Sequence, residues 1–366
     1  MSTLSIEDSA SLGDALQRLL QDRYGFADAR RRDLTTAPDT LPAIWPSLVE
    51  LGLTGLVVPE AQGGFGGGPA DLQRVQRELG RALVVSPWLG VALGAQVIQR
   101  AASAEQQGAW LSAIAEGRMT LALARDSVQD LGQPPAATLA QAVEGGWRLE
   151  GRKTNVLHAD AVSHLLVFAQ LPDGTPAWFL ADAAQAGVAC QRHRLVDHTW
   201  CADLVFSNAK AERLDGPDAP PTGVLRAVEI AAYCAEMLGG AQAALEHTVQ
   251  YLRTRQQFGQ ALGDYQALRH RVAEMAIAME QLRSAEELAF EGTAAGDAAA
   301  QTRLGAQALL IGCEAATWIQ RQAIQLHGGM GMTEEFAVGH HYRRQLVINA
   351  LTGGEAAALS ALAAGA

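Results

Sequence analysis

The sequence predicts an α+β protein built in the order helices, strands, helices. Apolar residues recur at three- and four-residue spacing before about residue 118 and again after residue 223, as in amphipathic helices. Between these regions, short apolar runs are separated by Gly, Pro and Asp turns, as β-strands are. At 366 residues the chain exceeds what one hydrophobic core usually supports, so we expect two or three packed units.

The amino-terminal region is helical from Ser11 to about Arg118. Its apolar residues stand about one helical turn apart, as in Ile44, Trp45, Leu48 and Leu51, and in Leu72, Val75 and Leu79. Residues 59–69 are too rich in Gly and Pro for a helix interior and predict a loop, with Asp71 as the cap of the next helix. These glycines lack the G-x-G-x-x-G spacing of a dinucleotide fingerprint, so a turn is their expected role.

The middle and last regions follow from the same kind of pattern. Strands are predicted at residues 120–124, 147–149, 165–168 and 178–180. The proline-rich residues 208–222 predict a linker. Helices then return, interrupted by turns at residues 259–264 and 292–297, which predicts a bundle of four or five helices.

Composition excludes several classes of function. The formal net charge is −11, whereas a general nucleic-acid-binding surface is positive. No uninterrupted apolar run approaches the roughly 20 residues needed to cross a bilayer, and the first residues lack the pattern of a secretory signal. We therefore expect a cytoplasmic protein with no membrane span and no nucleic-acid partner. The cysteines lack the spacing of a metal or disulfide framework and are expected to be reduced packing residues: Cys190, Cys201, Cys234 and Cys313.

Residues 251–266 are the most informative segment for function. A dinucleotide needs positive charge at its pyrophosphate, donors for its oxygens and a flat apolar surface for its adenine. Arg255 supplies charge through a planar fork that suits phosphate, and Phe258 and Leu262 would line an adenine or ribose slot. An arginine at a helix end is also commonly an exposed capping residue, and a lone phenylalanine is often core, so both roles stay open.

Residues 325–335 form a second segment of this kind. Gly328 and Gly329 have no side chain to hold a phosphate away from backbone N–H groups, and the amides of Gln266 and Gln325 would add donors. Glycine also ends helices routinely, so a helix stop is the alternative.

Residues 251–275 and 325–335 closely resemble the signature segments of the acyl-CoA dehydrogenase family, and residues 45–64 resemble its amino-terminal helical unit. The resemblance implies an amino-terminal α-helical domain (1–118), a middle β-barrel domain (119–212) and a carboxyl-terminal helical bundle (223–366) that carries the nucleotide half of an FAD site. In the family these positions serve FAD held mainly by the neighbouring subunit, so an oligomer, a dimer of dimers, is implied. The implied cofactor contacts are Arg255, Gln257, Phe258, Leu262, Tyr265, Gln266, Gln325, Leu326, Gly328 and Gly329.

The catalytic carboxylate of the family is missing from its usual place. Thr352 stands where the glutamate would be, and a hydroxyl is too weakly basic to remove a carbon-bound proton. A minority of the family carries the base on an earlier helix, which places Glu229 at that position. Apolar neighbours would raise its pKa if its face is buried, whereas a glutamate in the first turns of a helix is commonly exposed. Glu236 and Glu246 are expected to be solvated.

The middle region departs from the family as well. Residues 124–129 and 155–157 replace a loop and a strand that usually lie against the flavin ring, which removes an aromatic wall and a hydroxyl donor. The ring half of the FAD site is therefore expected to be eroded while the adenine half is kept, as in mixed assemblies that act on bulky acyl-CoA substrates.

Two hypotheses follow from the resemblance. The chain is an FAD-dependent acyl-CoA dehydrogenase subunit that desaturates a CoA thioester with Glu229 as base and passes electrons to an electron-transfer flavoprotein. Alternatively, it is a non-catalytic partner that completes the FAD site of a paralogous subunit. A flavin oxidase or monooxygenase on the same scaffold is a third possibility. The sequence does not identify the acyl group.

Overall fold

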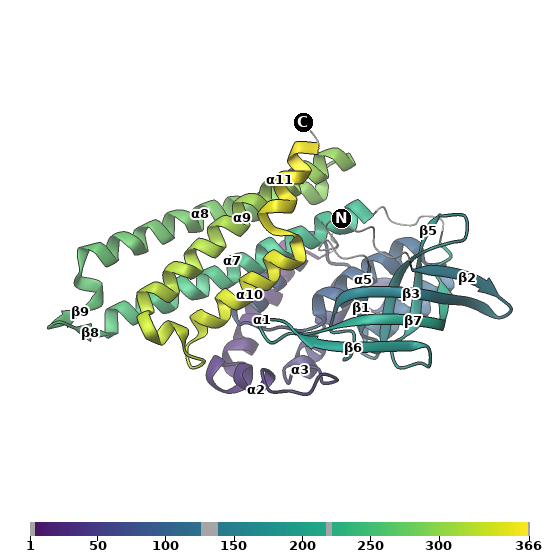
Figure 1. Cartoon of the computed structure of the whole chain (residues 1–366), viewed down its shortest axis with the longest axis horizontal. Helices are drawn as coiled ribbons and strands as arrows, with labels where there is room; N and C mark the ends of the chain where they lie inside the picture. Colours follow the sequence, from purple (N-terminus) through teal and green to yellow (C-terminus); the bar gives the residue numbers. More distant parts are fainter. Residues whose placement is uncertain (1–3, 126–137, 217–221, 365–366) are drawn as a thin grey trace. The chain divides into compact units, whose positions relative to one another are not determined.

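The computed structural model describes residues 4–125, 138–216 and 222–364 (Figure 1). The chain forms two compact units, which we call the strand unit and the bundle unit. The strand unit comprises residues 1–11, 32–72 and 85–225, and the bundle unit comprises residues 12–31, 73–84 and 226–366. The order helices, strands, helices confirms the predicted fold class, whereas the boundaries at residues 118, 212 and 223 stay predictions.

The amino-terminal part of the chain is helical, as its apolar periodicity predicts. Its elements are α1 (Ile6–Arg23), η1 (Phe26–Arg30), α2 (Arg31–Asp33), α3 (Trp45–Glu50), η2 (Leu53–Gly55), η3 (Glu60–Gln62), α4 (Pro69–Arg81), α5 (Trp88–Ala101) and α6 (Ala104–Ala115). A capping box starts α6, because the hydroxyl of Ser103 accepts from the N–H of Gln106 and the Gln106 side chain accepts from the N–H of Ser103.

The glycine-rich loop before α4 is a turn, as predicted. The N–H groups of Gly66 and Gly67 each donate to a carbonyl of residues 56–58 at 2.7 Å. Asp71, however, is not the cap of α4: it lies within the first turn, and its Oδ2 accepts from the N–H of Gly68 at 2.7 Å. The helix begins earlier because Pro69 has its φ already fixed for the first helical position.

The middle of the chain forms the strands β1 (Leu121–Ala124), β2 (Leu139–Val143), β3 (Gly146–Leu157), β4 (His164–Gln170), β5 (Pro176–Asp182), β6 (Val188–Arg194) and β7 (Trp200–Arg213). Pairing follows the order β1-β4-β2-β3-β7-β5, and β5 also pairs with β4, so the sheet closes on itself. Leu149, Leu165, Phe179 and Phe206 are fully buried in its core. The four predicted strands correspond to β1, β3, β4 and β5.

The predicted linker is wrong over residues 208–213, which belong to β7. Lys210 pairs with Arg148 of β3, and Arg213 pairs with Phe179 of β5. These ladders use backbone groups, so a polar stretch can extend a strand without the alternation of apolar residues that a sequence pattern detects.

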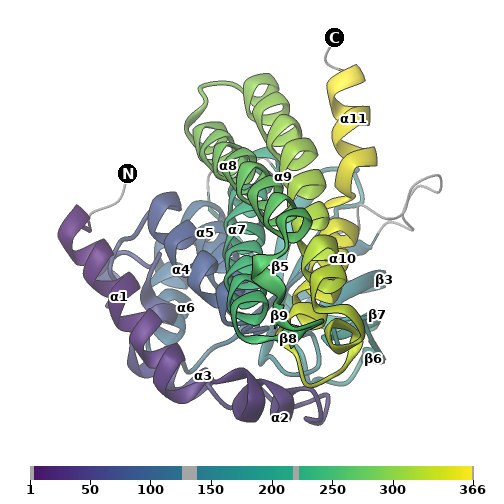
Figure 2. The same ribbon diagram turned by 90° about the vertical axis from the view of Figure 1, so that its left-hand side faces the viewer.

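The last third of the chain is a helical bundle with a small hairpin. Its elements are α7 (Thr222–Thr254), β8 (Gln256–Gln257), β9 (Gln260–Ala261), η4 (Leu262–Asp264), α8 (Gln266–Ala294), α9 (Ala298–His327), η5 (Gly328–Met332), α10 (Ala337–Thr352) and α11 (Gly354–Ala364). Helices α8 and α9 run side by side in both views (Figures 1 and 2). Asp297 caps α9 by accepting from the N–H of Ala300 at 2.7 Å.

Within the bundle unit, α4 and α7 cross with their backbones in close approach. A Cβ added at Gly239 would lie 2.0 Å from the carbonyl oxygen of Arg77, and one added at Gly80 would lie 2.6 Å from the carbonyl oxygen of Glu236. Each helix therefore presents a glycine at the crossing, because no side chain fits there.

A buried ionic network lies beside this crossing. Glu236 is 3% exposed, and its two carboxylate oxygens accept from Arg344 Nε at 2.6 Å and from Gln76 Nε2 at 2.7 Å. The prediction that Glu236 is solvated is therefore wrong, because a guanidinium 108 positions along the chain compensates its charge. Glu246 is exposed, as predicted, and forms an ion pair with Arg81.

Residues 337–364 form a helical segment that is long and apolar enough, by composition alone, to cross a membrane. Gly353 and Gly354, with φ of 79° and 55°, divide it into α10 of 16 residues and α11 of 11 residues. Each helix alone is shorter than the roughly 20 residues that a span needs.

Two adjacent histidines of α10 are held neutral by their surroundings. His340 is 2% exposed, and desolvation together with the nearby Arg343 guanidinium lowers its pKa to about 4. Desolvation also holds the pKa of His341 well below its usual range. The ring of Phe26 contacts His340 edge-on, with ring centroids 4.8 Å apart, and helps to enclose it.

Replacing Gly239 with alanine should destabilise the protein. The added methyl group would collide with backbone, so we expect the free energy of unfolding to fall by roughly 1–3 kcal/mol, as overpacked sites do. Thermal or urea unfolding measures the change. Gly108→Ala is the matched control, because nothing lies within 4 Å of a Cβ at that position of α6, and it should not destabilise. Equal stability of the two variants would contradict the close crossing.

Stability should fall as the pH drops from about 6.5 toward 4. Over this range an unfolded histidine takes up a proton while folded His340 does not, so the loss from this residue reaches an order of 2–3 kcal/mol near pH 4 and grows no further below it. Urea unfolding across pH checks this, with His340→Gln expected to flatten the dependence. A steep fall that is identical in that variant would assign the effect to other groups.

Candidate functional site

The hairpin that follows α7 presents Phe258 to solvent at one end of the bundle. Gln256 pairs with Ala261 and Gln257 pairs with Gln260, so Phe258 and Gly259 form its tip, with φ of 53° and 86°. The ring of Phe258 is 91% exposed. Figure 2 shows β8 and β9 at the end of the bundle that faces the viewer. The hairpin therefore holds an aromatic face outside the core.

Arg255 lies at the base of this hairpin with an exposed side chain. Its backbone is fixed on both sides, because its N–H donates to the carbonyl of Tyr251 and its carbonyl accepts from the N–H of Leu262, both at 2.8 Å. Among the described residues, the guanidinium has no hydrogen-bonded or ion-paired partner. An exposed guanidinium on a fixed backbone is suited to a phosphate. The alternative of a helix-capping side chain has no support in the contacts.

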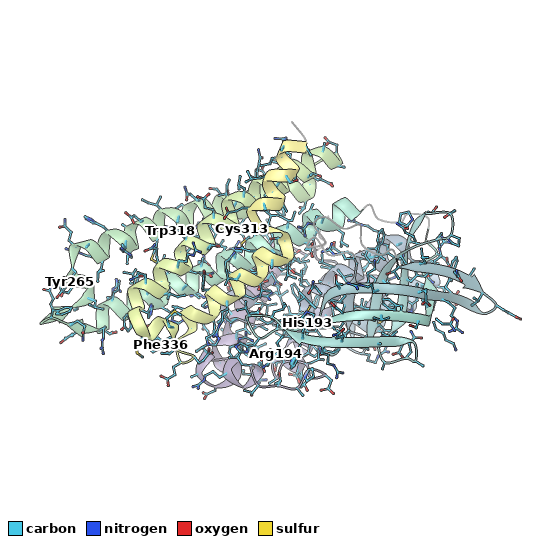
Figure 3. All side chains as sticks on the ribbon, viewed as in Figure 1. His193, Arg194, Tyr265, Cys313, Trp318 and Phe336 are labelled. Carbon is cyan, nitrogen blue, oxygen red and sulfur yellow. The ribbon has the colours of Figure 1, made fainter. Side chains whose placement is uncertain are left out.

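The end of α9 reaches the same end of the bundle. His327 stacks on Tyr251 of α7 with ring centroids 4.4 Å apart, and Phe336 contacts both rings edge-on. Tyr265, which follows the hairpin, lies with Phe336 toward this end of the bundle unit in Figure 3. Desolvation lowers the pKa of His327, so its ring is neutral in this stack. The stack thus brings the segment after α9 close to the base of the hairpin.

Gly328 and Gly329 follow directly after this stack and are exposed. Gly328 has φ 59° and ψ −140°, a backbone conformation that requires glycine. A Cβ at either position would meet nothing within 4 Å, so open space rather than crowding surrounds them. Gly328 does end α9, and it also leaves room for a ligand beside the backbone.

The remaining predicted cofactor contacts divide by exposure. Gln257, Gln266 and Gln325 are exposed, and the hydroxyl of Tyr265 donates to the carbonyl of Gln257 at 3.1 Å, which holds the hairpin in place. Leu262 is half-buried, and Leu326 is 6% exposed. The side chain of Leu326 therefore packs inside the bundle, and a contact with cofactor would involve its backbone. These roles stay predictions.

This region also has an exposed apolar residue that the sequence pattern does not indicate. Met332, in η5 directly after the glycines, is 75% exposed. Nothing in its local sequence distinguishes it from a core methionine, so only the fold reveals its position.

Glu229 and Thr352 lie at one place, although the sequence separates them by more than a hundred residues. Glu229 is 6% exposed in α7, which overturns the alternative of a solvated residue near a helix start. Arg226 joins the two positions: its Nη1 donates to Glu229 Oε2 at 2.8 Å, and its Nη2 donates to the carbonyl of Thr352 at 2.7 Å. Burial disfavours the ionised carboxylate, and the guanidinium opposes that effect.

Two segments, residues 124–129 and 155–157, are expected against the flavin ring, and the structure describes the second of them in full. Residues 126–129 of the predicted loop lie outside the described residues. Asn155, where an aromatic residue is usual, has φ 54°, and its N–H donates to Asp203 Oδ1 at 3.0 Å. Its side-chain oxygen lies 3.2 Å from Nε2 of His193, a residue labelled in Figure 3. This position therefore offers an amide held within the strand unit in place of an aromatic wall.

The fold is that of an acyl-CoA dehydrogenase, and comparison with known proteins shows the family directly. The family model "Acyl-CoA dehydrogenase, N-terminal domain" matches residues 7–118, and "Acyl-CoA dehydrogenase, C-terminal domain" matches residues 227–366. The chain belongs to this family of FAD-dependent oxidoreductases, which act on the CH–CH group of acyl-CoA.

Individual relatives are between 25% and 29% identical to this chain. Acyl-CoA dehydrogenase FadE27 of Mycobacterium tuberculosis is 29% identical over 82% of this chain and 81% of that protein. A variant of the Tcur3481–Tcur3483 steroid acyl-CoA dehydrogenase is 28% identical, with a TM-score of 0.87 over 98% of this chain and 97% of its own. The ChsE4–ChsE5 complex of M. tuberculosis is 25% identical, with the same TM-score over 100% of this chain and 98% of its own.

Arg255→Gln should weaken FAD binding. A hydrogen bond to a charged group contributes about 1.5–3 kcal/mol, so we expect affinity to fall roughly 10- to 100-fold. Flavin content after gel filtration and equilibrium titration with FAD measure the loss. Arg303→Gln, at an exposed position of α9, is the control and should bind like the wild type. Affinity equal to that of the control would remove Arg255 from the site.

Proposed function

We propose that this chain is an FAD-dependent acyl-CoA dehydrogenase, or a subunit of one, that desaturates a CoA thioester between its α and β carbons. The observation that carries the proposal is the exposed group at the bundle end: the guanidinium of Arg255, the aromatic face of Phe258 and the exposed backbone at Gly328 and Gly329. Positive charge, an apolar plane and accessible backbone fit the two phosphates and the adenine of FAD.

The exposure of this group supports an oligomer. The four residues project from the end of the bundle, so they suit an FAD molecule held mainly by a neighbouring protomer. A homo-oligomer or a hetero-oligomer of the dimer-of-dimers type satisfies that arrangement. The proposed partners are acyl-CoA, the second subunit and an electron-transfer flavoprotein, and the proposed location is the cytoplasm.

In this proposal Glu229 is the base that takes the α-proton. Its carboxylate is enclosed in the bundle unit, and water exclusion strengthens a carboxylate as a base. When bound, FAD supplies the acceptor for the hydride from the β-carbon. Thr352 has no basic group, and its hydroxyl donates within α10 to the carbonyl of Ile348 at 2.8 Å.

A second candidate function is a non-catalytic subunit that completes the FAD site of a paralogue. One observation favours it: Asn155, whose side chain is held by His193, replaces an aromatic wall. The steroid acyl-CoA dehydrogenase and ChsE4–ChsE5 structures, each named for a pair of proteins, support an assembly with a paralogous subunit.

Absorbance spectra distinguish the two candidates. The chain is purified alone and after co-expression with a paralogue encoded by the same organism, and acyl-CoA thioesters of increasing width are added without oxygen. Bleaching of the flavin that requires Glu229 supports catalysis by this chain. Flavin and bleaching that appear only with the paralogue, and that do not depend on Glu229, support the partner role.

Glu229→Gln should abolish the bleaching in whichever preparation shows it. An amide cannot accept the α-proton, so we expect the rate to fall by a factor on the order of 10²–10⁴ while flavin stays bound. Stopped-flow absorbance measures the rate. Glu246→Gln, an exposed glutamate of the same helix, is the control and should react like the wild type. A Glu229→Gln protein that bleaches at the wild-type rate would assign the base to another chain.

A further inference from the structure

Arg226 makes two hydrogen bonds from one guanidinium, and each has a different acceptor. Nη1 donates to Oε2 of Glu229, one helical turn away on α7, at 2.8 Å. Nη2 donates to the backbone carbonyl of Thr352, at the end of α10, at 2.7 Å. A guanidinium is planar and rigid, so bonds on both of its terminal nitrogens fix its orientation. The carbonyl at the end of α10 therefore orients Arg226, and Arg226 in turn orients the carboxylate of Glu229.

The carbonyl of Thr352 is available because α10 ends there. The last carbonyls of a helix have no partner within it, and Gly353 leaves the helix with a left-handed φ of 79°. The hydroxyl of Thr352 is engaged by the carbonyl of Ile348 and accepts from the N–H of Gly354. Arg226 thus satisfies a carbonyl that the helix leaves open, at the residue where the family usually carries its base.

The pair lies in a poorly hydrated place. The side chain of Glu229 is 8% exposed and that of Arg226 is 24% exposed. Removing one partner of a buried ion pair leaves the other charge uncompensated, which strongly disfavours the ionised carboxylate. Near Thr352, the Cys313 thiol hydrogen-bonds with the Thr352 side chain. Burial raises the pKa of Cys313 to about 11, with a smaller contribution from the charge of Glu355.

We propose that Arg226 is a positioning residue for Glu229: anchored on the carbonyl of Thr352, it directs the carboxylate and keeps it ionised until the thioester arrives. The inference rests on the proposed function, in which the C–H bond at the α-carbon breaks and its proton forms a new O–H bond on Glu229. In this proposal the backbone carbonyl of residue 352 anchors Arg226, and the threonine side chain has no part in that role.

The experiment uses the intact assembly that shows bleaching, carrying Arg226→Gln or Arg226→Lys. The rate of bleaching is measured from pH 5 to 10, together with the concentration of acyl-CoA that gives half the maximal rate. With glutamine, we expect the rising limb of the pH profile to move to higher pH by on the order of 1–3 units, because a nearby guanidinium shifts a carboxylate by that much. Substrate affinity should change by less than about threefold, since Arg226 does not contact the thioester in this proposal.

Arg226→Lys should restore part of the wild-type behaviour that Arg226→Gln loses. Its single ammonium keeps the charge but cannot hold two acceptors in a fixed plane, so the pH profile should return toward the wild type while the maximal rate stays reduced. This variant also provides the test if Arg226→Gln loses flavin or fails to fold.

The outcomes separate the inference from the proposed function. Wild-type rates in Glu229→Gln would refute the base and with it the proposed role of this chain. If Glu229→Gln is inactive but the flavin-loaded Arg226 variants keep the wild-type pH profile, the proposed function stands and the positioning role is overturned. A shifted profile in the glutamine variant with partial return in the lysine variant would establish that role.

Discussion

The close crossing of α4 and α7 is the constraint on which the bundle unit depends. Gly80 and Gly239 let the two backbones approach to a distance that a methyl group would prevent, and the buried Glu236 beside them is then within reach of Gln76 and Arg344. A buried charge is tolerated only when its partners are fixed in place. The glycine contact brings Gln76 of α4 to Glu236, and the bond from Arg344 attaches α10 to α7.

Helix α7 also contacts its neighbours at both ends of the bundle. At one end, Thr352 lies where Arg226 can bond to its carbonyl, so the end of α10 lies beside Glu229. At the other end, Tyr251 of α7 stacks on His327 of α9. Under the proposed function, α7 carries the buried Glu229 near its start and is followed by the exposed Arg255, and packing between these ends keeps both in position.

The sequence was sufficient for the features that follow a local pattern. Helical periodicity located the bundle, and the turn predicted at residues 259–264 lies at the hairpin that follows Arg255. It was not sufficient where distant residues decide the outcome. Glu236 looked solvated because its partner Arg344 is 108 positions away, and residues 208–213 looked like a linker because strand pairing uses the backbone. The i,i+3 spacing of Arg226 and Glu229 was visible, but the carbonyl that orients Arg226 was not.

Glu229 is buried at one end of the bundle, and Arg255 is exposed at the other. This difference bears on how catalysis and cofactor binding are divided among subunits. A charge that is buried and paired, as at Glu229, is already satisfied within this chain, whereas the guanidinium of Arg255 has no partner among the described residues. An exposed guanidinium keeps its hydrogen-bonding capacity for a ligand that another molecule brings. Under the proposed function, the exposed end of the bundle would bind a neighbouring protomer's cofactor, and the buried end would act within this chain. Arg255, Phe258 and the paired glycines would then serve the assembly, whereas ring-facing positions such as Asn155 would affect only this chain's own catalysis.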